Sequence, residues 1–219
     1  TLVILDMEPK KVAPRNLGEF AGADLRELVR AYVRRIEIAR QEFLDHEPSV
    51  RIGLYQVIVP DGRGQLTEEF AKRLCGSIAA GRLGMHDELD FICPVLYQRF
   101  GPEDPNSRSL GEWIAAATQQ AIDGSLALAR SDGTPVPLVP VLAFWVFNGN
   151  SQSDRKAVAP KRLGRQLELV QAATGIDAVV FWSGWETKEE MENAQKPVEG
   201  IDIVKFLGRT GALPWPGCT

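Results

Sequence analysis

Residues 2–8 read LVILDME, a short apolar run that ends in two carboxylates. An apolar run of this length, bounded by polar residues, is typical of a strand buried in a parallel sheet. Because side chains alternate between the two faces of a strand, we expect Asp6 and Glu8 to share a face with Ile4. The stretch therefore predicts a buried strand whose tip presents two neighbouring carboxylates.

This pair of carboxylates is suited to acid catalysis. Like charge and an apolar floor raise the pKa of one carboxyl group, which leaves a protonated acid beside an ionised partner. In the alternative interpretation, both carboxylates only pair with Lys10 or Lys11, or cap the helix that follows. Acids also end a strand in P-loop proteins, but no Gly-rich phosphate loop follows any apolar run in this sequence.

The rest of the chain repeats the pattern of an apolar run followed by a helical stretch. Further β runs are predicted at 51–59, 90–98, 138–147 and 178–183, and helices at 17–45, from Thr67, from Ser109 to Leu126, and at 160–174. Strands that alternate with helices predict an α/β fold, with a parallel sheet covered by helices. The missing phosphate loop favours a parallel (β/α) barrel of the TIM type, with five clear β/α units, over an open doubly wound sheet. No linker divides the chain, so we expect residues 1–219 to form a single domain.

Composition excludes several classes of function. The 219 residues include 25 Lys and Arg against 29 Asp and Glu, a net charge of −4, without a basic block, which argues against a nucleic-acid partner. No apolar run approaches the roughly 18–20 residues of a membrane span, so no membrane partner is expected. Cys75, Cys93 and Cys218 form no CxxC motif, which predicts neither a zinc site nor a disulfide framework. The chain starts at Thr1 without a signal peptide or an initiating Met, which indicates that upstream residues were removed.

Aromatic residues gather at the ends of the other predicted strands: Tyr55, Tyr97, Trp145 and Trp182. In both candidate architectures, function lies at the carboxyl ends of the strands. Aromatic faces with a few polar groups suit a sugar ring, whose C–H faces stack on them while its hydroxyls form hydrogen bonds. Each aromatic taken singly is more typical of a core. Their recurrence at four tips, opposite two carboxylates, indicates carbohydrate binding.

With these residues assembled, the chain resembles the hyaluronidase family and, more loosely, other Asp-x-Glu glycoside hydrolases with barrel folds. The run ending Asp6-Met7-Glu8 resembles the family's strand ending Asp-Trp-Glu, with Met in place of Trp. Residues 52–55, leading to Pro60-Asp61, are similar to its Gly-Tyr-Tyr followed by Phe-Pro-Asp. Residues 93–97 (CPVLY) resemble its Tyr-Pro-Ser-Ile-Tyr, and residues 179–183 (VVFWS) its Val-Val-Ile-Trp-Gly. The resemblance extends over about residues 2–185.

The resemblance implies roles for these residues. Glu8 would be the general acid/base that protonates the leaving glycosidic oxygen. Asp6 would orient the substrate's own acetamido group, the nucleophile in this family, and Tyr55 and Tyr97 would help to position that group. Trp182 would form a wall of the sugar subsite. The activity needs no metal and no organic cofactor.

The implied substrate is a polysaccharide, and a polysaccharide that contains N-acetylhexosamine is one candidate. The resemblance also implies a secreted or periplasmic location. Hyaluronan itself is not favoured, because a polyanion favours a basic groove and this chain is net acidic. The main alternative to a glycosidase is a non-catalytic carbohydrate-binding or structural relative. A third hypothesis is a hydrolase of another chemistry on the same barrel.

In the family, earlier β/α units precede the Asp-x-Glu strand. We therefore expect this chain to form the C-terminal two-thirds of a barrel that lacks its first strands. An incomplete barrel exposes a sheet edge, so an N-terminal segment or a partner chain is expected to cover the first strand.

Overall fold

The computed structural model of the chain describes residues 1–7, 13–98, 107–143, 158, 160–173, 175–176 and 178–182. Its elements are β1 (Leu2–Leu5), η1 (Pro14–Glu19), α1 (Gly22–Leu44), β2 (Arg51–Tyr55), α2 (Glu68–Arg82), η2 (Met85–Glu88), β3 (Phe91–Cys93), α3 (Ser107–Leu126), β4 (Val141–Ala143), α4 (Pro160–Ala172) and β5 (Val180–Trp182). The predicted alternation of strands and helices is confirmed. The stretch after residue 182 lies outside the described residues.

The strands are parallel and follow chain order. One sheet has the order β1-β2-β3, and β4 pairs with β5 in a second sheet. Two parallel bridges continue this order: Ile92 of β3 pairs with Leu138, just before β4, and Val95, just after β3, pairs with Val141 of β4. This sequential order differs from that of a doubly wound sheet, which reverses at a switch point. The α/β fold with parallel strands is therefore confirmed, but the described strands are short and do not close into a barrel.

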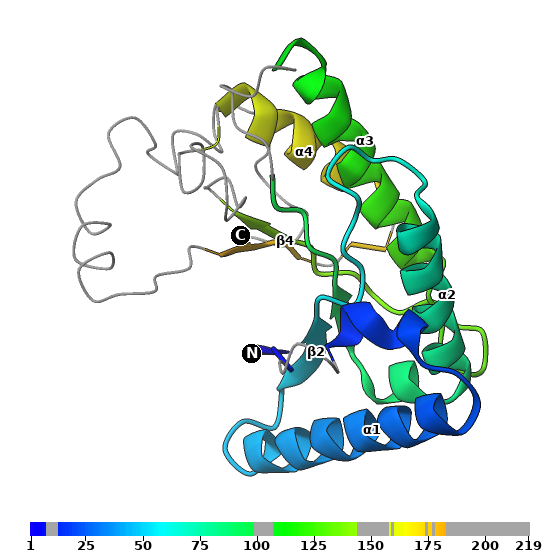
Figure 1. The fold of residues 1–219 in the computed structure, drawn as a ribbon. Coiled ribbons are helices and arrows are strands. Elements are labelled where there is room, and N and C mark those ends of the chain that lie inside the picture. Colours follow the sequence, from blue (N-terminus) through cyan, green and yellow to red (C-terminus); the bar gives the residue numbers. More distant parts are fainter. Residues whose placement is uncertain are drawn as a thin grey trace, which may run out of the picture.

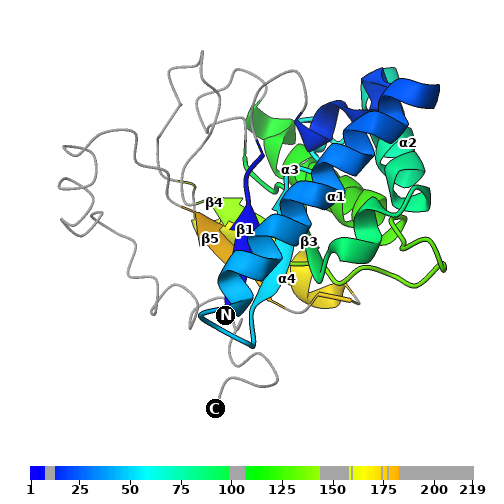
Figure 2. The same cartoon turned by 90° about the horizontal axis from the view of Figure 1, so that it is seen from below.

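The four long helices lie on one side of the strands (Figures 1 and 2). The main core lies between the helices and the strands. In it, Val29, Tyr32 and Ile36 of α1 pack in one buried cluster with Ile52 and Leu54 of β2. A second, smaller cluster contains Phe91, Cys93, Val139 and Val141, with Ile4, Tyr55, Tyr97 and Val180 packed against it. Adjacent strand residues thus point to opposite faces, as the alternation in the sequence predicts.

The helix predicted at 17–45 is two elements in the structure. The chain is extended at Phe20 and Ala21, between η1 and α1. We attribute the break to close packing of η1 against α2. The two elements are so close that a Cβ added at Gly18 or Gly76 would overlap backbone atoms of the other element. A break of this kind depends on a contact between segments far apart in the chain, and helical periodicity does not report it.

The starts of α2 and α3 can be compared with the start residues predicted from the sequence. Thr67 caps α2, since its Oγ1 accepts a hydrogen bond of 3.1 Å from the backbone N–H of Phe70, as a Thr at this position favours. The third helix was expected to start at Ser109, but α3 begins at Ser107.

The observed strands are shorter than the predicted β runs. β2 ends at Tyr55, where Gln56 takes a positive φ of 59°. β3 ends at Cys93, because Pro94 has no N–H to donate to a ladder. In the run predicted at 138–147, β4 covers Val141–Ala143, and residues beyond 143 lie outside the described part.

β1 forms the edge of the described sheet. It pairs with β2 through Leu2 to Leu5, and no other described strand pairs with it. Among the described helices, none combines the length and apolar character needed to cross a bilayer.

Candidate functional site

Three of the predicted site residues lie at neighbouring strand ends. Leu5 of β1 is paired in register with Leu54 of β2. The next residues along the two segments are Asp6 and Tyr55, so these two residues lie at the same position along the sheet. Tyr55 is in turn level with Cys93 of β3, and Tyr97 lies four residues further along the chain. Parallel strands place their carboxyl ends at one edge, so the register brings together residues from three segments of the sequence.

A direct hydrogen bond joins the two tyrosines. The Tyr55 hydroxyl donates to the Tyr97 hydroxyl at 2.6 Å, and the ring centroids lie 6.4 Å apart with a tilt of 47° between the planes. Both side chains pack against the smaller core cluster and are partly exposed. The pair therefore has an apolar floor and a face that a ligand can reach.

The environment of Tyr97 keeps its phenol protonated. Burial, followed by smaller contributions that include the negative charge of Asp6, raises the pKa of Tyr97 well above its usual range. A neutral phenol retains an O–H donor at every physiological pH. The exposed carboxylate of Asp6, by contrast, offers acceptor oxygens on the same side of the sheet.

The other predicted site residues are not placed by the structure. Glu8 and Trp145 lie outside the described residues. Trp182 is the last residue of β5, level with Ala143 of β4, and its side chain lies outside the description. The structure thus brings together Asp6, Tyr55 and Tyr97.

A strained residue borders the tyrosine pair. Gln56 follows Tyr55 directly, and it is the only described non-glycine residue with a positive φ, at 59°. Such a conformation costs on the order of 1–2 kcal/mol for an L residue other than glycine, and strained residues cluster at functional sites. Sequence reasoning missed Gln56, because glutamine is not a residue that favours this conformation.

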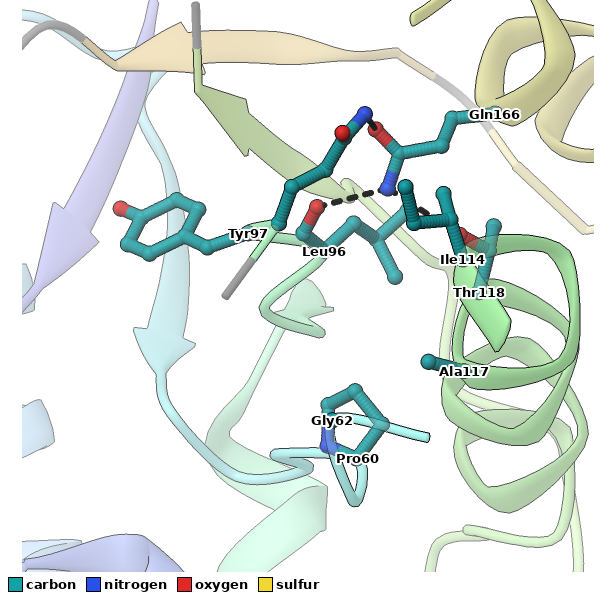
Figure 3. A pocket seen from close by; sticks show the side chains of 9 residues that line it. Pro60, Gly62, Leu96, Tyr97, Ile114, Ala117, Thr118 and Gln166 are labelled. Atoms are coloured by element: carbon teal, nitrogen blue, oxygen red, sulfur yellow. Dashed lines mark hydrogen bonds between the residues drawn. The ribbon is translucent and has the colours of Figure 1, made fainter. Parts of the chain in front are cut away.

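Sequence reasoning also missed a buried polar network behind Tyr97. Gln166 of α4 donates from Nε2 to the carbonyl oxygen of Leu96 at 2.9 Å and to Oγ1 of Thr118 at 3.1 Å. Its Oε1 accepts a hydrogen bond of 2.7 Å from Nε2 of Gln98. These residues line a hollow whose wall includes Pro60 and Ile114 (Figure 3). No sequence signal indicated it, since isolated glutamines are common on helix surfaces.

Comparisons with known proteins are informative for the fold alone. No protein-family model matches the chain, and no curated protein matches it. The sequential parallel strands with outer helices form an α/β fold, and solved structures of hyaluronidase are similar to it. In particular, it is similar to a monoclinic crystal structure of bee venom hyaluronidase, with 11% identity, a TM-score of 0.54, and coverage of 90% of this chain and 68% of that one.

A second solved structure gives the same result. Bee venom hyaluronidase in complex with a hyaluronic acid tetramer is 12% identical, with a TM-score of 0.55, and the match covers 95% of this chain and 69% of that chain. The resemblance to hyaluronidase inferred from the sequence is thus confirmed as a distant similarity of fold.

Proposed function

We propose that this chain is a glycoside hydrolase-like protein that binds and cleaves a polysaccharide. The observation that carries the proposal is the meeting of Asp6, Tyr55 and Tyr97 at one edge of parallel strands. Its fold is similar to that of an enzyme that has been solved with a bound hyaluronic acid tetramer.

The chemistry of these three residues suits an acetamido group. Such a group has one N–H donor and one carbonyl acceptor. A carboxylate accepts from the N–H, and a phenol donates to the carbonyl. Asp6 and the tyrosine pair supply both partners, which supports a substrate that contains N-acetylhexosamine.

Glu8 is the proposed general acid/base, two residues after Asp6 in the sequence. It would protonate the leaving glycosidic oxygen, while Asp6 orients the acetamido group that attacks the sugar carbon. Trp145 and Trp182 are the proposed stacking surfaces for sugar rings. The proposed mechanism requires no metal ion or organic cofactor.

An N-terminal segment or a partner chain is proposed to cover the outer edge of β1. This edge would otherwise present backbone N–H and C=O groups without a strand partner, which favours association with other strands.

The test compares Glu8→Gln with the wild type on a panel of N-acetylated and non-acetylated polysaccharides. Release of reducing ends measures hydrolysis, and calorimetry measures binding. We expect Glu8→Gln to lose hydrolysis at least 100-fold and to bind the glycan within about threefold of the wild type. Glu42→Gln, on the exposed side of α1, is the matched control and should retain full activity.

Binding without hydrolysis by the wild type would favour the alternative, a non-catalytic carbohydrate-binding relative. Wild-type hydrolysis that Glu8→Gln leaves unchanged would exclude Glu8 as the acid.

A further inference from the structure

The segment that carries Tyr97 follows β3 and is joined to β4 by the parallel bridge between Val95 and Val141, in which the N–H of Val141 donates to the carbonyl of Pro94. β3 ends at Cys93, and Pro94 cannot donate to a neighbouring strand. Beyond it, the N–H of Val95 donates to the carbonyl of Ile58, and the N–H of Leu96 donates to the carbonyl of Val141. The carbonyl of Leu96 then receives a side chain, Gln166, in place of a strand.

Gln166 contacts this segment on both sides of Tyr97. Its Nε2 donates to Leu96, the residue before Tyr97, and its Oε1 accepts from Gln98, the residue after it. Thr118 of α3 accepts from the same Nε2, so two helices converge on the segment. Gln98 and Gln166 are each 3% exposed, which shields these hydrogen bonds from competition with water.

The orientation of both amides follows from hydrogen-bond chemistry. A backbone carbonyl only accepts, so Nε2 of Gln166 must face Leu96, and its Oε1 must face Gln98. Gln98 therefore presents its Nε2 to Gln166, and its own Oε1 has no hydrogen-bond partner among the described residues. Apolar side chains would fill the same space without that buried acceptor. The network is consequently better explained by what it holds than by packing alone.

The network contacts Leu96 and Gln98, the residues on either side of the phenol of the proposed site. Figure 3 shows Gln166 directed toward Leu96 and Thr118, while the ring of Tyr97 points away from them. At the far end of that ring, the Tyr97 hydroxyl accepts the hydrogen bond from Tyr55. Leu96 belongs to the main core cluster and Tyr97 packs against the smaller one, so their side chains lie on opposite sides of the backbone.

We propose that Gln166 is a positioning residue for Tyr97, which holds the residues before and after it so that the phenol stays at Tyr55. Its consequence for catalysis rests on the proposed function, whereas the positional effect can be measured without activity.

Tyrosine NMR provides that measurement. The chain has 3 tyrosines, so ¹³Cζ labelling gives three signals that Tyr→Phe variants assign. Two variants break the hydrogen bonds of Gln166 to Leu96 and Gln98: Gln166→Glu puts a carboxylate oxygen against the Leu96 carbonyl, and Gln166→Met removes the hydrogen bonds at similar volume. Gln171→Glu, on the exposed surface of the same helix, is the matched control.

In the wild type and Gln171→Glu, we expect the Tyr97 phenol to titrate above the ordinary range of a tyrosine. In both Gln166 variants, we expect the phenol to become more exposed to water, so that its signal shifts at pH 7 and titrates closer to that ordinary range. The signal of Tyr32 in α1 should not move in any variant.

The proposal is overturned if Gln166→Met is folded, as judged by circular dichroism and cooperative unfolding, and its Tyr97 signal matches the wild type at every pH. Gln166→Met decides the matter if Gln166→Glu fails to fold. On an active glycan, the Gln166 variants should lower kcat at least tenfold. If the wild type cleaves no glycan, the proposed function fails, while the NMR result still decides the role of Gln166.

Discussion

The hydroxyl of Tyr55 donates a hydrogen bond of 2.6 Å to the hydroxyl of Tyr97, across 42 residues of sequence. We expect Tyr55→Phe and Tyr97→Phe each to reduce the free energy of unfolding by about 1 kcal/mol, and the double variant to lose less than the sum. Urea unfolding of the four proteins measures the coupling. Tyr32→Phe combined with Tyr55→Phe is the control pair, and its effects should add.

Gln56 provides a test of backbone strain. At a φ of 59°, glycine is favoured over alanine because it has no Cβ. We expect Gln56→Gly to be more stable than Gln56→Ala by about 1 kcal/mol, measured as the difference between the two free energies of unfolding. Both variants lose the glutamine side chain, so the comparison isolates the backbone. Equal stabilities would show that Gln56 is not strained in solution.

His86 makes stability depend on pH. The side chain is fully buried, and its Nδ1 lies 3.0 Å from the carbonyl oxygen of Ala129. A carbonyl only accepts, so Nδ1 carries the proton of the neutral ring. Burial lowers the pKa of His86 below its ordinary value of 6.5, so protonation is easier in the unfolded chain than in the folded one.

The contribution of His86 to stability is therefore complete above pH 6.5 and is lost as the pH falls from there toward its folded pKa. The loss has a slope of up to about 1.4 kcal/mol per pH unit. We expect His86→Asn to flatten the fall in unfolding free energy between pH 7.5 and 5, and His46→Asn, at an exposed position, to leave it unchanged. A wild-type curve that His86→Asn does not alter would contradict the assignment.

Gly53 lies beneath the tyrosine pair on the same face of β2. A Cβ at this position would overlap the buried ring of Phe91. We expect Gly53→Ala to lower the free energy of unfolding by about 1–3 kcal/mol, as overpacked cores do. Adding Phe91→Leu should recover part of that loss, because the smaller side chain leaves room for the methyl group. A Gly53→Ala protein as stable as the wild type would show that the ring moves aside at little cost.

Much of the fold could be predicted from local patterns. The apolar runs located all five described strands, and residue alternation separated Leu54, in the main core, from Tyr55, on the opposite face. Strand ends were less well predicted. Pro94 and the positive φ of Gln56 end strands whose apolar patterns continue past them.

The candidate site was predictable in part for a similar reason. A strand tip has a sequence signature, so Asp6, Tyr55 and Tyr97 could be named from the residues alone. Gln166 could not, because it lies 70 residues from Leu96 in the sequence and has no distinctive neighbours.

By itself, the sequence determined which segments are strands and helices, which face of each is apolar, and which residues stand at the strand ends. These properties follow from side-chain periodicity within a few residues. Only the tertiary structure decided that the described strands follow chain order without closing, that Tyr55 meets Tyr97, and that Gln166 reaches Leu96. Strand register and helix placement set those contacts, and both arise from packing between segments that are distant in the chain.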